Sequence, residues 1–251
     1  MFASAPPTVN PPRPSRSTIS RLVSACGSFL APPHCVLCDA AGLPGPLDLC
    51  ADCLAELPRV ASGEGFESPA FARVCCPWRF EFPVDALVRA LKFHGERAYA
   101  RLLGTLLARA RAACDAPLPQ LVVPVPLHPA RLRERGYDQA AELARFAARE
   151  LALPLERGLL RRARPTRGQT ALSARERALN VAGAFIATRR LQAAPPLALV
   201  DDVVTTGSTV LAAAAALRAA GSGPIELWVV SRAARRRHGD GREYALQDPQ
   251  R

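Results

Sequence analysis

The sequence predicts an α/β protein whose main domain is a mostly parallel sheet flanked by helices, preceded by a small four-cysteine segment. From Leu121 onward, short apolar runs alternate with amphipathic stretches, which is typical of β–α units. The run 197–200 is apolar at every position, as in a strand that is buried on both faces of a parallel sheet. Two matched cysteine pairs before residue 54 indicate a separate unit that a metal holds together.

Size and charge narrow the classes of protein and partner. The 251 residues suffice for one large domain, or for an ordinary domain with a small appendage. The formal net charge of +11 favours anionic partners such as phosphates or nucleic acid, although a solvated basic surface would give the same excess. We expect no membrane span, because no apolar run reaches the required length. Prolines interrupt the N-terminus where a signal peptide would have its apolar core, so a cytoplasmic location is predicted.

Four regions follow from composition and patterning. Residues 1–17 are rich in Pro and Ser and are expected to be disordered. Residues 18–58 are expected to form a helix at 18–30 and then the four-cysteine segment. The sheet domain is expected at 70–232, and a basic, polar tail that frays at 233–251.

The elements of the sheet domain follow from hydrophobic periodicity. Loose alternation over 74–82 indicates a strand or a hairpin, and helical spacing predicts helices over 84–93 and 97–114. The later elements are a strand at 121–126, a helix at 139–151, a strand at 197–200, a helix at 206–220 that Gly221 closes, and a strand at 225–230.

The main candidate site follows the apolar strand at 197–200. Ligands of parallel sheets bind beyond the carboxyl ends of the strands, where Asp201 and Asp202 would emerge. The segment 205–209 then opens a helix, whose free amide groups and dipole favour a phosphate. Gly207 allows a close backbone approach, and further donors are the hydroxyls of Thr205, Thr206, Ser208 and Thr209. A simple helix cap needs one such residue, so this set indicates a site for a phosphorylated ribose.

At this point the sequence resembles a known family. The segment 199–209, Leu-Val-Asp-Asp-Val-Val-Thr-Thr-Gly-Ser-Thr, is similar to the phosphoribosyl-pyrophosphate (PRPP) motif of type I phosphoribosyltransferases. The resemblance implies that Asp201 and Asp202 contact the ribose hydroxyls, that 205–209 holds the 5′-phosphate, and that Mg²⁺ accompanies PRPP. Purine-salvage members often have an aspartate where this chain has Thr205, which argues against that class of activity.

Two Cys-x2-Cys pairs separated by eleven residues form the candidate metal site: Cys35, Cys38, Cys50 and Cys53. Four thiolates are a tetrahedral set for Zn²⁺ with no open position for a substrate, so a structural zinc is predicted. In a chain without an export signal, metal binding is favoured over disulfides. Four unrelated thiols are the alternative. The other cysteines, Cys26, Cys75, Cys76 and Cys114, are interpreted as packing residues.

The order of the motifs resembles the ComF family over about residues 19–232. After the four-cysteine segment come Ala-Leu-Lys-Phe-His-Gly at 90–95, Val-Pro-Val-Pro-Leu-His at 123–128, Arg-Gly-Tyr-Asp-Gln at 135–139, Arg-Pro-Thr-Arg-Gly-Gln-Thr-Ala-Leu-Ser at 164–173, and the PRPP-like motif. This resemblance implies a type I phosphoribosyltransferase-like fold with an N-terminal zinc finger. Members are implicated in natural competence, which implies single-stranded DNA or the DNA-uptake machinery as partners. Asp138 stands where the family usually has Asn.

Two arginine-rich segments flank the predicted site. By position, 126–136 corresponds to the loop that type I enzymes place against pyrophosphate, and 161–169 corresponds to the flap that closes over the ligand. Arginine forks suit phosphate oxygens, and the candidate pyrophosphate ligands are Arg133, Arg135, Arg164 and Arg167. For each single arginine, a solvated basic face is the alternative.

Two functions are compatible with these features. The first is a competence-associated protein that binds PRPP or a related phosphoribosyl ligand and handles incoming single-stranded DNA or its partners. The second is an active phosphoribosyltransferase that acts on a base or nucleotide in salvage. The sequence displays no catalytic base that would identify an acceptor, so whether the chain is an enzyme stays open. Aromatic residues make up only 6% of the chain, which disfavours direct stacking on bases.

Overall fold

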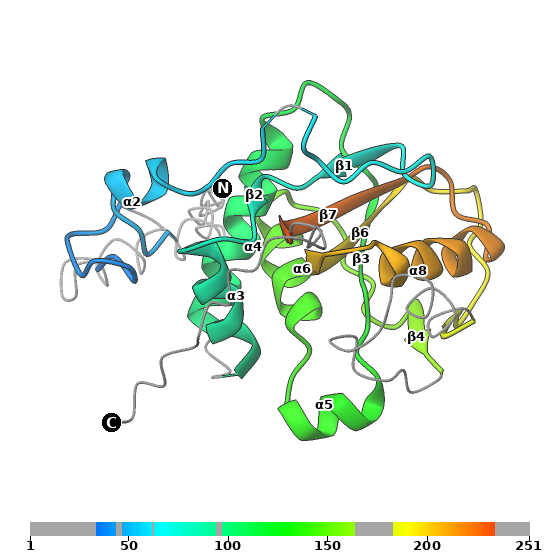
Figure 1. Cartoon of the computed structure of the whole chain (residues 1–251). Coiled ribbons are helices and arrows are strands. Elements are labelled where there is room, and N and C mark those ends of the chain that lie inside the picture. Colours follow the sequence, from blue (N-terminus) through cyan, green and yellow to red (C-terminus); the bar gives the residue numbers. More distant parts are fainter. Residues whose placement is uncertain (1–33, 44–46, 62, 94–96, 164–182, 234–251) are drawn as a thin grey trace, which may run out of the picture. The chain divides into compact units, whose positions relative to one another are not determined.

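The computed structural model describes residues 34–43, 47–61, 63–93, 97–163 and 183–233 (Figure 1). The chain forms two compact units, Met1–Leu54 and Ala55–Arg251. The segments expected to be disordered or helical before residue 34, and the expected tail beyond residue 233, lie outside the described residues. None of the helices in the described part combines the length and apolar character that crossing a bilayer requires.

The second unit is built on a five-stranded sheet, and within the described residues every strand pair of this sheet is parallel, as predicted. Its strands are β1 (Arg73–Cys75), β2 (Trp78–Arg79), β3 (Leu121–Pro124), β6 (Leu197–Val204) and β7 (Ile225–Arg232). β6 lies between β3 and β7, and both β1 and β2 pair with the other edge of β7. The sheet therefore places the predicted site strand, β6, at its centre.

The region expected to form one strand or a hairpin contains two short strands that both run parallel to β7. Cys75 of β1 lies opposite Trp228, and Trp78 of β2 lies opposite Ser231. Between them, Pro77 has no N–H group to donate to the ladder, which interrupts the pairing. A hairpin would have reversed the chain, so that alternative is wrong.

Helices flank the sheet on both faces (Figure 1). They are α4 (Arg97–Ala112), α6 (Gln139–Glu150) and α8 (Ser208–Ala219), and α3 (Val84–Phe93) packs against α4. All four are close to the predicted ranges. α4 and α6 pack closely at Gly104, where a Cβ atom would lie 2.6 Å from the carbonyl oxygen of Leu143. On the other face, Leu197 and Leu199 pack in one core cluster with Leu217 of α8.

The predicted pyrophosphate loop at 126–136 contains a helix, α5 (Pro129–Arg135). The side chain of His128 accepts a hydrogen bond from the amide of Ala130, and Pro129 supplies a favourable backbone angle at the first helical position. Gly136, in the left-handed conformation, ends the helix. These local capping signals overcame the loop-forming composition of the segment.

The predicted flap begins as a strand. β4 (Leu160–Arg162) pairs with β5 (Phe185–Ala187) in an antiparallel ribbon, and Leu160 and Phe185 pack in the same core cluster as α8. Residues 164–182 of the connecting chain, including Arg164 and Arg167, lie outside the described residues. β6 is also longer than expected, because its ladder with β7 continues to Val204. The two acids therefore lie within β6 and not beyond its end.

Candidate functional site

The two acids of β6 point to opposite faces of the sheet. Alternate residues of a strand share a face, and Leu199 packs in the cluster that contains α8. Asp201, two residues later, therefore lies on the α8 side, where it lines a hollow together with residues 203–210. Asp202 lies on the other face, where it meets Lys92 of α3. The acidic pair thus reaches two different environments.

The loop after β6 turns into α8 at Gly207. This glycine is the N-cap of α8 and has a left-handed backbone, with a φ of 78°. A glycine cap has no side chain that could accept hydrogen bonds from the first amides of the helix, so those donors point to an anion or to water. Beside it, the hydroxyls of Thr206 and Ser208 lie 3.0 Å apart. The loop has the donors and the geometry for a phosphate group.

Phe66 lies directly against this glycine. A Cβ atom on Gly207 would lie 2.3 Å from Cζ of the Phe66 ring, so a side chain there would require the ring to move. The segment before β1 is held in place by Arg232, whose guanidinium donates to the carbonyl oxygen of Gly65 at 2.9 Å. The sequence gives no signal for Phe66, because it lies in a segment with the composition of a linker.

Asp202 is buried, with 5% of its surface exposed. Its Oδ2 lies 3.0 Å from Nζ of Lys92, and its Oδ1 accepts a hydrogen bond of 2.6 Å from the amide of Val203. Oδ1 of Asp201 accepts from the amide of Asp202 at 2.8 Å. Burial, and after it the charge of Asp202, raise the pKa of Asp201 to about 8. Burial and the neighbouring charge thus disfavour the ionised form of Asp201.

Lys92 is a site residue that sequence reasoning missed, although the motif at 90–95 contains it. It is the only lysine among 33 basic residues, which is the one signal that the sequence offers. The side chain is 24% exposed and belongs to the last turn of α3. A lysine ammonium is a compact point charge on a flexible stem, which lets it reach the buried Asp202 carboxylate from the last turn of α3.

Asp138 joins the end of β3 to the start of α6. Its Oδ1 accepts from the amide of Ala141 at 3.0 Å as the N-cap of α6, and its Oδ2 accepts from the amide of Leu127 at 2.9 Å. Burial is the main cause that raises the pKa of Asp138, and the charge of Asp202 adds to it. Asp138 therefore has a structural role as a helix cap, which an Asn could also fill because Asn and Asp are comparable N-caps.

The described arginines take several positions around the site. Arg133 is exposed on α5, whereas Arg135 donates to Oε1 of Gln139 at 2.9 Å. Arg162 of β4 is 8% exposed, and its guanidinium carbon lies 5.3 Å from the centroid of the Phe185 ring. Burial, and after it the positive charge of Arg131, lower the pKa of Arg162, while the Asp201 carboxylate opposes that shift. Arg162 thus shares its surroundings with Asp201.

The first unit holds the predicted cysteine cluster. The four sulfur atoms, from Cys35, Cys38, Cys50 and Cys53, all lie within 4.8 Å of one another. Tetrahedral metal–thiolate bonds of about 2.3 Å place sulfurs about 3.8 Å apart, so the set fits one metal ion. Cys53 lies in the first turn of α2 (Ala51–Ala55), and its amide donates to Sγ of Cys50 at 3.4 Å.

The pKa values of these thiols favour at least one thiolate. Burial raises the pKa of Cys35, but amide hydrogen bonds from Cys50, Leu37 and Cys38 outweigh it and lower that pKa to about 6. Hydrogen bonds with Cys38 and Cys50 are the leading causes that raise the pKa of Cys53. Four thiols packed this closely cannot all ionise without a cation, which is what a bound metal supplies. The predicted cluster is confirmed as a possible structural metal site.

Curated relatives match most of the chain, although no family model matches it. Competence protein F of Haemophilus influenzae is 32% identical over 73% of this chain and 84% of its own length. The DNA utilization protein YhgH of Salmonella typhi is 32% identical over 86% of this chain and 98% of its own. The protein of that name in Escherichia coli K12 is 33% identical over 65% of this chain and 74% of its own.

Two solved structures have weaker likeness. One, described as the allosteric regulatory enzyme of purine biosynthesis, has a TM-score of 0.36 and 24% identity over 52% of this chain and 25% of its own. Adenine phosphoribosyltransferase from Leishmania tarentolae has a TM-score of 0.33 and 16% identity over 55% of this chain and 59% of its own. The fold class rests on the parallel sheet and its flanking helices themselves.

Proposed function

The chain belongs to the ComF family, and on that premise we propose that it binds PRPP or a related phosphoribosyl ligand and acts in the DNA uptake of natural transformation. The names of its relatives, competence protein F and DNA utilization protein, support the role in uptake. The single observation that supports the ligand is the glycine-capped start of α8, which directly follows two acids at the carboxyl end of a central parallel strand. We place this activity in the cytoplasm.

We assign the parts of the ligand by position. The amides and hydroxyls of 205–209 hold the 5′-phosphate, and Asp201 and Asp202 form the acidic pair for the ribose. Arg133 and Arg135 of α5, with Arg164 and Arg167, are proposed to meet the pyrophosphate. Arginine forks make charge-assisted hydrogen bonds with phosphate oxygens. Mg²⁺ bound together with PRPP would neutralise part of the pyrophosphate charge.

Substitution of both acids tests the ligand. The variant Asp201→Asn with Asp202→Asn should lose measurable binding of Mg²⁺–PRPP in calorimetry while it keeps its circular dichroism spectrum. Asp115→Asn is the matched control, because Asp115 is an exposed acid in the turn after α4. Unchanged affinity in the double variant would remove the phosphoribosyl ligand from this site.

The second candidate is an active phosphoribosyltransferase that acts on a base or nucleotide. Both acids and the loop are intact, and transfer through an oxocarbenium-like sugar requires no nucleophilic side chain. The same protein can therefore be screened for pyrophosphate release from PRPP in the presence of purine and pyrimidine bases. Release that depends on one base would favour the enzyme, whereas binding without release would favour a ligand-dependent role in uptake.

We propose that the four-cysteine cluster holds one Zn²⁺ with a structural role. Four thiolates leave no ligand position open, and so small a unit has little other core. Elemental analysis should find about one zinc per chain, and the four thiols should resist alkylation until a chelator is added. Cys114, which lies outside the cluster, serves as the internal control for the reagent.

Direct contact with single-stranded DNA, if it contributes, should be electrostatic. The net charge of +11 and the scarcity of aromatic residues favour phosphate contacts over base stacking. Affinity for single strands of different sequence should then be similar and should fall steeply between low and physiological salt. An affinity that depends on sequence and not on salt would contradict this contribution.

A further inference from the structure

We propose that Lys92 is a positioning residue of this site: its ion pair fixes Asp202 against α3, so that Asp201 is the acid left to meet the sugar hydroxyls. This inference rests on the proposed phosphoribosyl ligand and assigns different roles to the two acids. It also gives a function to a side chain that the resemblance leaves without one.

The contacts of Asp202 with the protein are the first step. One carboxylate oxygen accepts from the amide of Val203, the other forms an ion pair with the Lys92 ammonium at 3.0 Å without the geometry of a hydrogen bond, and the side chain is 7% exposed. A ligand hydroxyl would have to displace the lysine or enter a buried position. Asp202 is therefore occupied within the protein, although it belongs to the motif.

Asp201 is placed differently. Its Oδ1 accepts from the amide of Asp202, and in the described part of the chain nothing donates to its Oδ2. Asp201 lines the hollow that residues 203–210 complete, whereas Asp202 does not line it. The hollow also contains the start of α8, where the phosphate is proposed to bind. A sugar attached to that phosphate reaches Asp201 first.

The charges around Asp201 and Asp202 explain why a cation is needed beside these two acids. Asp201 is faced by two carboxylates, Asp202 of β6 and Asp138 before α6, and by two cations, Lys92 of α3 and Arg162 of β4. Two adjacent carboxylates without a cation share a proton, because the second charge is repelled. Lys92 opposes that repulsion and lowers the pKa of Asp201. Its removal should move the ionisation of Asp201 to higher pH.

The experiment compares Lys92→Met, Lys92→Arg and the control Arg89→Met, in which another cation of α3 loses its partner Asp85. Binding of Mg²⁺–PRPP to the full chain is measured between pH 6 and 9.5. We expect Lys92→Met to weaken binding at pH 7.5 by about tenfold, which corresponds to about one pKa unit on Asp201, and to shift the midpoint upward. Lys92→Arg should restore most of the affinity, and Arg89→Met should match the wild type. A folded Lys92→Met variant with an unshifted midpoint would overturn the proposal.

The double variant Lys92→Met with Asp202→Asn separates the roles of the two acids. It removes the ion pair as a whole, so it also remains informative if the single variant fails to fold. We expect it to bind within a few-fold of wild type, whereas Asp201→Asn alone should lose binding. The reverse result would make Asp202 the ligand acid and overturn the inference.

A protein that binds no phosphoribosyl ligand would overturn the proposed function, and the role of Lys92 can then be measured without ligand. Carbon-13 NMR of the aspartate carboxyls gives the pKa of Asp201 in the free protein. A higher value in Lys92→Met than in wild type supports the positioning role, and an equal value contradicts it.

Discussion

In the described part of the chain, two ion pairs that each include a buried side chain lie against the parallel sheet, one at each end, and their surroundings differ. Arg111 of α4 meets Glu226 near the start of β7, and Lys92 of α3 meets Asp202 near the end of β6. Further hydrogen bonds from and to protein groups complete the first pair, whereas two more carboxylates lie near the second. The difference shows which end of the sheet provides stability and which end is suited to a ligand.

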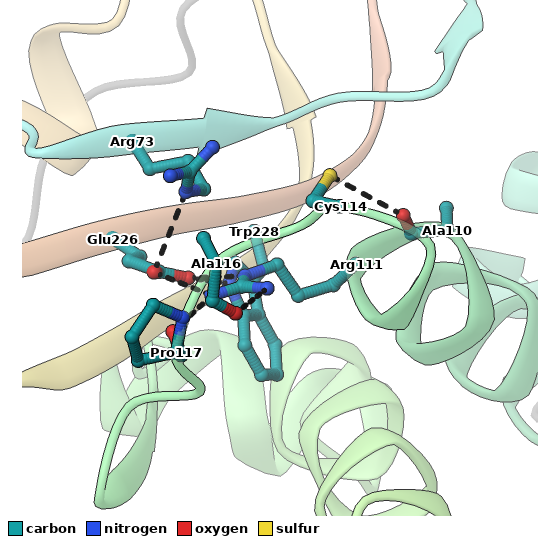
Figure 2. A network of polar contacts seen from close by, with 8 residues as sticks. All are labelled: Arg73, Ala110, Arg111, Cys114, Ala116, Pro117, Glu226 and Trp228. Carbon is teal, nitrogen blue, oxygen red and sulfur yellow. Dashed lines mark hydrogen bonds and ion pairs between the residues drawn. The ribbon is translucent and has the colours of Figure 1, made fainter.

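The hydrogen-bond partners of Arg111 are other groups of the protein (Figure 2). Arg111 is fully buried and donates to both carboxylate oxygens of Glu226, at 2.7 and 2.8 Å. Its other N–H groups donate to the carbonyl oxygens of Ala116 and Pro117, and the indole of Trp228 donates to Glu226. Such a bidentate pair, with two further carbonyl acceptors, fixes the end of α4 to the sheet.

The other end of the sheet is unbalanced. Asp201 and Asp138 add carboxylates beside the Lys92–Asp202 pair, and burial with like charge raises the pKa of Asp201 to about 8. Arrangements of this kind cost stability and are found where a ligand completes them. The carboxyl end of the strands is where parallel sheets bind ligands, so the contrast follows the chain direction of the sheet.

The largest effect should come from Arg111→Met. It leaves the Glu226 carboxylate largely buried with only Trp228 and the more distant Arg73 beside it, which should cost about 3–5 kcal/mol in the free energy of unfolding. Replacement of both partners, Arg111→Met with Glu226→Leu, should recover much of that loss. Urea unfolding gives both values.

The affinity for the ligand should distinguish Arg111→Met from Lys92→Met. Folded Arg111→Met should bind Mg²⁺–PRPP as the wild type does, because the network lies at the far end of the strands. A loss of affinity comparable to that of Lys92→Met would show that the two ends are not separate in function.

The same contrast bears on how much the sequence could predict. The proposed phosphate loop at 205–209 and the cysteine cluster are both contiguous patterns in the sequence, and the structure brings the four cysteines of the two Cys-x2-Cys pairs together. The parallel sheet was predictable as well, because a short run that is apolar at every position is typical of a strand covered on both faces. Both kinds of signal are local.

The features that the sequence did not predict depend on contacts between distant segments of the chain. Arg111 and Glu226 are 115 residues apart, and Lys92 and Asp202 are 110 apart, so no local pattern joins either pair. Phe66 was missed for the same reason, since its role is defined by Gly207. The strand at 197–200 was predicted too short, because its extension depends on the pairing partners in β7.

A smaller effect is expected from Gly207→Ala. The left-handed backbone costs an alanine about 1–2 kcal/mol, and the overlap with Phe66 adds about 1–3 kcal/mol, with the lower values expected because Phe66 is only partly buried. Gly207→Ala with Phe66→Ala should remove the overlap and leave the backbone cost. Thermal unfolding of the two variants and of Phe66→Ala alone gives the coupling. Equal losses with and without Phe66 would mean that the ring does not constrain the loop.

The smallest effect on stability is expected from substitutions of Asp138. They also test most directly how the charges around Asp201 influence one another. Asp138→Ala removes the acceptors for Ala141 and Leu127 and should cost about 1 kcal/mol. Asp138→Asn keeps one acceptor and removes a partly buried charge, so the two changes should offset each other to within about 0.5 kcal/mol.

The pH dependence distinguishes the charge of Asp138 from its hydrogen bonds. The pKa of Asp138 is raised in the folded state, so the stability it contributes is present at low pH and is lost as the pH rises through that pKa; Asp138→Asn should flatten this slope. The charge of Asp138 also raises the pKa of Asp201, and its removal should shift the pH midpoint of ligand binding downward, opposite to Lys92→Met. Titrations of ligand binding in Asp138→Asn and in Lys92→Met measure the direction of each shift in the pH midpoint. Asp138→Ala is the control that lacks both the charge and the helix cap. Shifts in the same direction would mean that packing, and not charge, connects these residues to Asp201.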